Sequence, residues 1–361
     1  MKIVFVLPCI SLSGGVKVVF EYANHLKERG HEVIIVYPII PMNQGYKWYD
    51  LKKWLLRLIG SLRNIKRGIK VNWFHLNVPL LMVPTLNENY IPEADVIIAT
   101  GWKTAEYVAG YTKNKGEKFY LVQSYETWDG PKEQVEKTYK SCLHNIVVST
   151  WLKNELENLG AKIDGLILNS IDFSEFYKEN KRENKSKEVR ILIPYRIGQW
   201  KGAEDGIKAF EIVKRNCENV KLVLFGSKPN KKHLPPNTEF HVWPIKDELR
   251  SIYNSCEIFC FPSRLEGFGL PPMEAMACGC AVVSTDVGAI RDYAINNVTV
   301  LISTPGKVAE LAELVCQLIK DENRRKKIAD AGYEHIKQFS WRKSTDELEN
   351  ILKKYANNTE K

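Results

Sequence analysis

The sequence predicts an α/β protein built from two doubly wound, Rossmann-like domains. Short apolar runs alternate with amphipathic helical stretches, which is the pattern of parallel α/β units. This pattern starts a second time near residue 189, after a polar and highly charged stretch at 178–187 that we expect to be a solvated loop. A chain of 361 residues is also long enough for two domains of this kind.

The first half contains five expected strands and one clearly marked helix. The strands are expected at 2–7, 32–37, 96–99, 118–123 and 145–148. A helix at 16–29 follows the first strand directly, and Gly30 ends it. Its apolar positions recur at helical spacing: Val16, Val19, Phe20, Ala23 and Leu26.

The second half repeats the alternation and is followed by a terminal helix. Its strands are expected at 189–194, 220–225, 239–242, 258–261, 281–284 and 300–302. A last helix is expected at about 340–355 and contains Trp341. Ligands of such open sheets bind at the carboxyl ends of the strands, so the loops that follow the strands are the places to search for a site.

Composition indicates a soluble protein with an anionic partner. The chain is 44% hydrophobic and 26% charged, which is ordinary for a globular protein. Its net charge is +9, from 52 basic and 43 acidic residues. This excess suits a nucleotide diphosphate, an acidic glycan or a membrane surface. No nucleic-acid-binding motif accompanies the charge, so nucleic acid is not an expected partner.

Cysteine usage and the start of the sequence indicate a cytoplasmic location. The eight cysteines are scattered, mostly inside apolar runs, and none forms a Cys-x-x-Cys pair. We expect reduced, buried thiols rather than disulfides or a zinc site. The apolar run at 1–8 is too short for a signal peptide and lacks a cleavage site, and no run of 18 apolar residues could span a bilayer.

The most informative segment is 263–277, where two carboxylates lie eight residues apart. Glu266 falls in an expected loop, and Glu274 falls in the first turn of a helix that starts at Pro271 and Pro272. The free N–H groups of such a first turn form an anion site. Together these groups can hold a sugar, a diphosphate and a ribose. The alternative, that Glu274 only complements the helix dipole, does not explain Glu266.

This segment, followed by the small residues and strand of 278–288, resembles the Glu-x7-Glu signature of retaining glycosyltransferases of the GT-B fold, family 4 in particular. The resemblance covers nearly the whole chain. It implies two domains facing across a cleft: an acceptor-binding domain at 1–168 and a nucleotide-sugar donor domain at 169–340. The segment 341–361 would cross back to the first domain.

The resemblance also implies a function. The enzyme would move a sugar from a nucleotide-diphosphate-sugar donor to a glycan or lipid-linked acceptor, in surface polysaccharide or glycoconjugate assembly. Two alternatives stay open: a GT-B phosphorylase or epimerase, and a non-catalytic nucleotide-sugar-binding partner subunit. The base, the sugar, the acceptor and the linkage are not predicted.

Four side chains carry the implied chemistry in the second domain. Arg196 and Lys201 resemble the family's clamp on the donor diphosphate, where they would stabilise the departing charge. Glu274 would accept hydrogen bonds from the ribose hydroxyls, and Glu266 would contact the donor sugar near its reacting end. The alternative is that Arg196 and Lys201 are ordinary surface residues of an exposed basic loop. Further donor contacts implied by the resemblance are Gly267, Phe268, Gly269, Leu270 and Ile245.

Two features of the first domain complete the implied site. Gly14 and Gly15, in the expected loop before the first helix, resemble the family's Gly-Gly loop at the donor phosphates or sugar; the alternative is an ordinary tight turn. Gln123 and Glu126 stand where many relatives place a histidine. Their Gln-x-x-Glu pattern looks like a subset that includes bacterial rhamnosyltransferases, so they would touch the sugar or the acceptor. The alternative is a plain acidic loop.

No metal or other cofactor is expected. The sequence contains no Asp-x-Asp motif, and its seven histidines do not cluster; His31 is expected to be structural. Arg196, Lys201 and a helix end would balance the diphosphate charge, so no Mg²⁺ is required, and the nucleotide-diphosphate sugar is a substrate rather than a cofactor.

The segment 52–70 has seven basic residues, no acidic residue and an apolar stripe. This pattern suits peripheral binding to an anionic membrane surface, on its inner face. The alternative is a domain helix with a solvated basic face.

Overall fold

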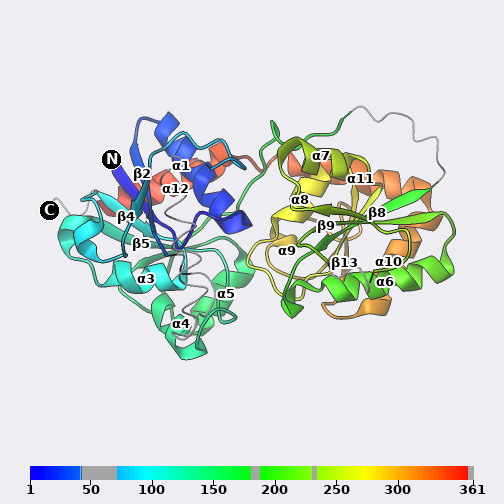
Figure 1. Cartoon of the computed structure of the whole chain (residues 1–361), viewed down its shortest axis with the longest axis horizontal. Coiled ribbons are helices and arrows are strands. Elements are labelled where there is room, and N and C mark those ends of the chain that lie inside the picture. Colours follow the sequence, from blue (N-terminus) through cyan, green and yellow to red (C-terminus); the bar gives the residue numbers. More distant parts are fainter. Residues whose placement is uncertain (41, 43–70, 180–187, 230–233, 357–361) are drawn as a thin grey trace. The chain divides into compact units, whose positions relative to one another are not determined.

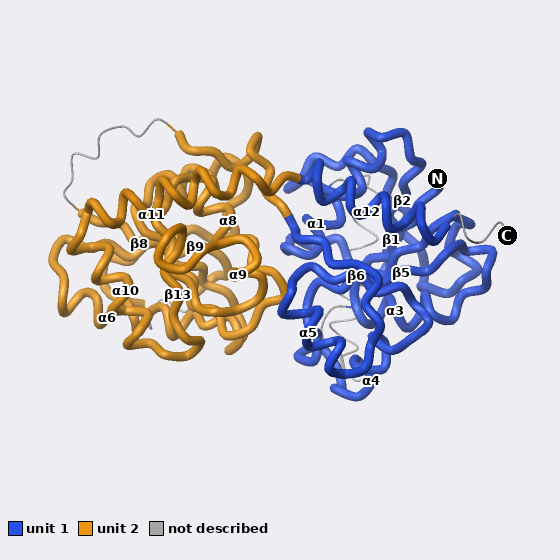
Figure 2. The backbone as a smooth tube through the Cα atoms, turned by 180° about the vertical axis from the view of Figure 1, so that it is seen from behind, with its two compact units in different colours: residues 1–169, 341–361 blue, residues 170–340 orange. Residues whose placement is uncertain are grey.

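The computed structural model describes residues 1–40, 42, 71–179, 188–229 and 234–356, and it divides the chain into two compact units. Unit 1 comprises Met1–Asn169 and Trp341–Lys361, and unit 2 comprises Ser170–Ser340 (Figure 2). Each unit is a parallel sheet with helices on both faces (Figure 1). The basic segment 52–70 lies outside the described residues.

Seven parallel strands form the sheet of unit 1, in the order β3-β2-β1-β4-β5-β6-β7. They are β1 (Lys2–Val6), β2 (Glu32–Pro38), β3 (Leu80–Val83), β4 (Val96–Ala99), β5 (Glu117–Val122), β6 (His144–Val147) and β7 (Ile163–Leu166). The central strands are apolar throughout because helices cover both faces of the sheet. In β1, for example, Val4 is fully buried and pairs with Ile34 of β2 and Ile97 of β4.

The helices of unit 1 include one from the far end of the chain. They are α1 (Gly14–Glu28), η1 (Glu88–Tyr90), α3 (Trp102–Ala109), η2 (Lys113–Lys115), α4 (Lys132–Tyr139), α5 (Thr150–Asn158) and α12 (Trp341–Ala356). Helix α12 packs against α1, where the rings of Tyr22 and Trp341 meet edge to face at 5.2 Å. The predicted terminal helix is therefore part of unit 1.

Six parallel strands form the sheet of unit 2, in the order β10-β9-β8-β11-β12-β13. They are β8 (Val189–Tyr195), β9 (Val220–Gly226), β10 (Glu239–Val242), β11 (Ile258–Phe261), β12 (Ala281–Thr285) and β13 (Leu301–Ser303). The helices are η3 (Gln199–Lys201), α6 (Ala203–Asn216), α7 (Lys246–Asn254), α8 (Leu270–Ala277), α9 (Ile290–Tyr293), α10 (Val308–Lys320) and α11 (Glu322–Ile336).

Two helix layers enclose the sheet of unit 2. Helices α6 and α10 pack together on one face, and α8 and α11 on the other (Figure 1). Helix α6 turns Phe210 and Val213 toward β8, where they share a buried core with Ile191 and Ile193. This packing fixes the start of α6, and with it the loop that joins β8 to α6.

The predicted strands agree with the structure to within one residue at each end, but two strands were missed. Strands β3 and β7 form the two edges of the unit 1 sheet. An edge strand is buried on fewer sides and needs less apolar sequence, and β7 contains Asp164 and Gly165. Among the described residues, no helix combines the length and the hydropathy that a bilayer crossing requires.

Candidate functional site

The candidate site of unit 2 lies where the strand order reverses. Strands β9 and β10 follow β8 to one side of the sheet, and β11 returns to the other side of β8. The carboxyl ends of β8 and β11 therefore border a switch point, the usual ligand position in an open α/β sheet. The loop after β8 carries Arg196 and Lys201, and the loop after β11 carries Glu266.

Hydrogen bonds join these two loops through one carbonyl group. The oxygen of Trp200 accepts from the backbone nitrogens of Arg264 at 2.7 Å and Leu265 at 3.2 Å. Gly202 then turns the chain into α6 with a φ of +62°, and a Cβ at this position would lie 1.9 Å from the oxygen of Pro262. Only glycine combines this dihedral with this close approach.

Lys201 and Glu266 are brought into direct contact. The Nζ atom of Lys201 lies 2.9 Å from each carboxylate oxygen of Glu266, and Ser263 Oγ donates to Glu266 Oε1 at 2.8 Å. The Lys201 and Glu266 side chains are 29% and 14% exposed. Because the pair still reaches solvent, a ligand can compete for both charges.

Arg264 ties the same loop to α6. Its guanidinium donates to both oxygens of Asp205, at 2.6 and 2.8 Å, in the bidentate geometry that an arginine–carboxylate pair favours. Neither residue was singled out in the sequence. Arg264 belongs to the 263–277 motif, but Asp205 lies 59 positions away and gave no local signal.

Glu274 lies further into its helix than predicted. Helix α8 begins at Leu270 rather than at the two prolines, so Glu274 is the fifth helical residue and not part of the first turn. Its carboxylate is buried, and Oε2 accepts from the hydroxyl of Tyr253 at 2.9 Å. Burial, followed by the charge of Glu274, raises the pKa of Tyr253 well above its usual range, so this phenol stays a donor.

The start of α8 offers fewer N–H donors than predicted. Pro271 and Pro272 occupy the second and third helical positions, and neither has an N–H group. The donors that this helix start can present are those of Gly269 and Leu270. The preceding loop is held in place from outside, because Tyr293 donates to the oxygen of Gly269 at 2.8 Å.

Phe268 is fixed in the same way as Gly269. The backbone nitrogen of Ala289 donates to the oxygen of Phe268 at 2.9 Å. Gly288 comes so close that a Cβ there would lie 2.7 Å from that oxygen. The loop Gly267 to Leu270 is therefore rigidly placed between Glu266 and Glu274.

Arg196 lies beside the aromatic ring of Trp243. Within the described part of the chain, it forms no hydrogen bond to Glu266. Its Cζ atom is 5.7 Å from the ring centroid of Trp243, in cation–π geometry. Trp243 has a φ of +49°, which is unusual for a bulky residue, and its side chain is exposed. Ile245 precedes α7 directly.

In unit 1, Gly14 and Gly15 are not loop residues as predicted. They are the first two residues of α1, because Ser13 caps the helix and its Oγ accepts from Val16 N at 3.3 Å. Gln123, at the end of β5, is brought to this helix start: its Nε2 donates to the oxygen of Gly15 at 3.1 Å. The structure therefore brings Gln123 and Gly15 into direct contact.

Glu126 forms hydrogen bonds within unit 1 that the sequence did not reveal. Its Oε2 atom accepts from the backbone nitrogen of Trp102 at 2.6 Å and from the Tyr120 hydroxyl at 3.1 Å. Burial raises the pKa of Glu126 to about 7, against the lowering effect of these two hydrogen bonds. Trp102 begins α3 after β4, and Gly101 before it was the only local signal.

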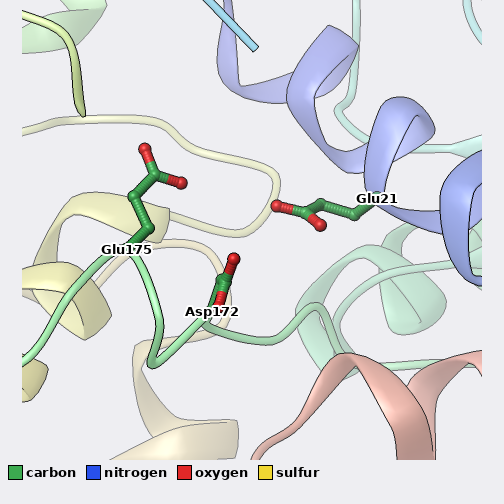
Figure 3. A group of neighbouring side chains, drawn as sticks. All are labelled: Glu21, Asp172 and Glu175. Atoms are coloured by element: carbon green, nitrogen blue, oxygen red, sulfur yellow. The ribbon is translucent and has the colours of Figure 1, made fainter. Parts of the chain in front are cut away.

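Three further carboxylates belong to different units (Figure 3). Glu21 lies on α1 of unit 1, whereas Asp172 and Glu175 lie in the turn that opens unit 2. In that turn, oxygens of Asp172 and Glu175 lie within 4.8 Å of each other, and the Ser174 nitrogen donates to Asp172 Oδ1 at 2.7 Å. This is an Asp-capped turn, and an acidic pair by itself does not define a metal site.

Comparisons with known proteins show which proteins this chain is similar to. Residues 175–335 match the protein family described as "Glycosyl transferases group 1". The capsular polysaccharide biosynthesis glycosyltransferase CapM of Staphylococcus aureus is 29% identical over 239 residues, which are 61% of this chain and 61% of CapM. The uncharacterized glycosyltransferase YqgM of Bacillus subtilis is 28% identical over 201 residues, 53% of this chain and 55% of YqgM. The chain thus spans little more than half the length of these relatives.

A solved structure extends the likeness to both units. The structure of HepE from Anabaena in complex with UDP-glucose has a TM-score of 0.75 and 16% identity, and the match covers 98% of this chain and 100% of HepE. At this identity the match concerns the fold alone. The two parallel-sheet α/β units predicted for the GT-B fold are confirmed. Residues 175–335, which match the group 1 glycosyltransferase family, lie within unit 2.

Proposed function

We propose that this chain is a retaining, family 4 glycosyltransferase that transfers a sugar from a nucleotide-diphosphate sugar to a glycan or lipid-linked acceptor. The family match of unit 2 supports the transferase chemistry, and the name of CapM supports a role in surface polysaccharide assembly. HepE, which shares the fold, was solved with UDP-glucose and supports a nucleotide-sugar donor.

The observation that carries this proposal is the Lys201–Glu266 pair at the switch point. A diphosphate placed there would attract the ammonium of Lys201 and neutralise part of the charge that develops on the leaving group. The carboxylate of Glu266 would then be free to accept a hydroxyl of the donor sugar. Glu266 need not become a covalent nucleophile, because in same-face attack the departing phosphate takes the proton of the acceptor hydroxyl.

Two other groups would grip the rest of the donor. The carboxylate of Glu274, which accepts from Tyr253 at Oε2, would contact the ribose, because a carboxylate can accept from both hydroxyls of a diol. Arg196 would contribute a second positive charge at the diphosphate, so this mechanism requires no metal. We assign acceptor binding to unit 1, at Gln123 and Glu126. Gly14 and Gly15, at the start of α1, would contact the donor.

A panel of nucleotide sugars, including rhamnose donors, tests the assignment. We expect slow hydrolysis of one donor without acceptor, transfer with acceptor, and a product whose anomeric configuration, read by NMR, equals that of the donor. Treatment with EDTA should leave the rate unchanged. Dependence on inorganic phosphate would instead indicate a phosphorylase, and tight donor binding without turnover would indicate a binding subunit.

Replacement of Lys201 tests the role of the pair. We expect Lys201→Ala to lower kcat by about 10²–10³-fold, because the leaving group loses a preorganised cation. Lys208→Ala, an exposed lysine of α6, is the matched control and should keep normal turnover. Circular dichroism verifies that both variants fold, and near-normal kcat in the Lys201 variant would contradict the mechanism.

A further inference from the structure

Glu126 presents one occupied and one unoccupied carboxylate oxygen. Oε2 accepts from the Trp102 backbone nitrogen and from the Tyr120 hydroxyl, whereas Oε1 has no hydrogen-bond partner within the described part of the chain. The carboxylate lies just beyond the carboxyl end of β5, beside the start of α3, which follows β4. Strands β4 and β5 are neighbours, and β4 borders the switch point of the unit 1 sheet.

The backbone N–H of Trp102 has no acceptor capacity, so it holds Oε2 as an acceptor. The fully buried Tyr120 keeps its proton, because burial raises the pKa of its hydroxyl well above the usual range, and this hydroxyl also donates to Oε2. When Glu126 is protonated, the proton is therefore favoured on Oε1, which then donates; when Glu126 is ionised, Oε1 accepts.

The neighbouring charges do not balance the negative charge of ionised Glu126. Lys103 of α3 faces it, but its Nζ is paired with Asp129 of the same loop at 3.0 Å. The hydroxyl of Tyr139 on α4 bonds to the backbone of this loop, where it accepts from Glu126 N and donates to Ser124 O. These two carboxylates, Glu126 and Asp129, and the paired ammonium of Lys103 disfavour a phosphate at Oε1 and suit a neutral hydroxyl donor.

We propose that Oε1 of Glu126 binds a hydroxyl of the acceptor sugar, and that the ionised carboxylate is the binding form. The inference rests on the proposed function, because it takes unit 1 as the acceptor-binding unit. The hydroxyl donates its hydrogen bond to Oε1 and keeps its proton in this complex. Glu126 thus selects an acceptor by a hydroxyl at a fixed position, whereas a lipid phosphate of the same acceptor would bind elsewhere.

Glu126→Gln reverses the polarity of the free position while keeping its shape. The backbone N–H of Trp102 requires an acceptor, so the amide oxygen must take the place of Oε2. The NH₂ group then stands in place of Oε1 and cannot accept a hydroxyl hydrogen. We expect the KM for the acceptor to rise by about tenfold or more relative to the KM for the donor, because the acceptor loses one hydrogen bond to a charged group.

The pH profile gives a readout that a structural role would not produce. In the wild type, kcat/KM for the acceptor should increase from about pH 6 to about pH 8 as Glu126 ionises. Glu126→Gln should lose this limb. Tyr120→Phe removes a hydrogen bond to the ionised form, so the limb should move to higher pH. Glu136→Gln, which removes a carboxylate bonded to Tyr125 in the same unit, is the control and should leave the limb in place.

Two outcomes would overturn the proposal: an unaltered acceptor KM in folded Glu126→Gln, or a pH limb that this variant retains. Should Glu126→Gln fail to fold, the Tyr120→Phe shift decides in its place, and an unshifted limb then counts against the proposal. Failure of the proposed function is distinguishable, because the wild-type protein would then neither hydrolyse nor transfer from any nucleotide sugar.

Discussion

Gly202 shows how one small residue controls the candidate site. We expect Gly202→Ala to destabilise unit 2 by roughly 2 kcal/mol or more, because the methyl group would overlap the Pro262 oxygen and the φ of +62° is strained for alanine. The loop would have to move, and the Lys201–Glu266 pair would separate. Thermal denaturation measures the first effect and donor hydrolysis the second.

Gly306→Ala is the matched control for this substitution. Gly306 has a φ of +77°, but a Cβ at this position would lie 4.0 Å from its nearest neighbour, Arg264 Nε. This variant should lose only about 1 kcal/mol, from backbone strain, and should keep its donor hydrolysis. Equal stability losses in the two variants would show that the contact with Pro262 is unimportant.

The sequence identified candidate residues more readily than the side chains that contact them. Lys201, Glu266 and Glu274 stand in short motifs that can be interpreted locally. Their neighbours cannot be, since the contact between Lys201 and Glu266 joins positions 65 apart in the chain. No polar role was predicted for Tyr253, Trp102 and Tyr120, because these roles arise only when separate elements of the fold come together.

The position of Glu274 and of the glycines at α1 depended on where a helix begins. Two prolines suggested a start at Pro271, but Leu270 adopts helical geometry directly after Gly269, whose φ is +92°. At α1, Ser13 supplies the cap and draws Gly14 into the first turn. The start of a helix is set by a single capping residue. Sequence periodicity therefore locates helix starts less accurately than it locates buried strands.

Helix α12 is held on unit 1 by charged side chains as well as by packing. Glu349 accepts from Lys353, Arg29 and His31, and these bonds lower its pKa to about 2. We expect Glu349→Gln to lower the free energy of unfolding at pH 7 by on the order of 1–2 kcal/mol. Its folded pKa lies below the unfolded one, so this contribution exists above about pH 4.5 and disappears as the pH falls toward 2.

Denaturation curves from pH 7 down to acid conditions check this expectation. The wild type and the Glu349→Gln variant should differ near neutrality and converge in acid. Glu334→Gln is the control: Glu334 pairs with Lys337 at the surface of unit 2, and exposed pairs contribute little. A pH-independent difference between wild type and Glu349→Gln would contradict the electrostatic explanation.

The whole chain was predictable because its two halves repeat one scheme. Buried parallel strands produce continuous apolar runs, which are a strong sequence signal, and this signal located five of the seven strands in unit 1 and all six in unit 2. The edge strands β3 and β7 lack it. The facing of the two domains across a cleft stays a prediction, since hydrophobic periodicity describes each sheet and not its neighbour.

The basic segment 52–70 also concerns the molecule as a whole. We expect that replacing Lys52, Lys53, Arg57 and Arg63 by glutamine weakens sedimentation with anionic liposomes, because each basic residue near the surface contributes about 1 kcal/mol. Donor hydrolysis should not change. Neutral liposomes are the control, and equal binding of both proteins to anionic liposomes would dismiss the membrane role.

Unit 2 is an insertion within unit 1, because the chain leaves unit 1 after Asn169 and re-enters it at Trp341. The ends of the insertion are adjacent, since Ile171 and Ser340 pair in a parallel bridge. A ribosome therefore finishes the inserted half before it makes the helix that covers α1. During synthesis the inserted half emerges before α12, so Tyr22 of α1 stays uncovered by Trp341 until α12 has been made.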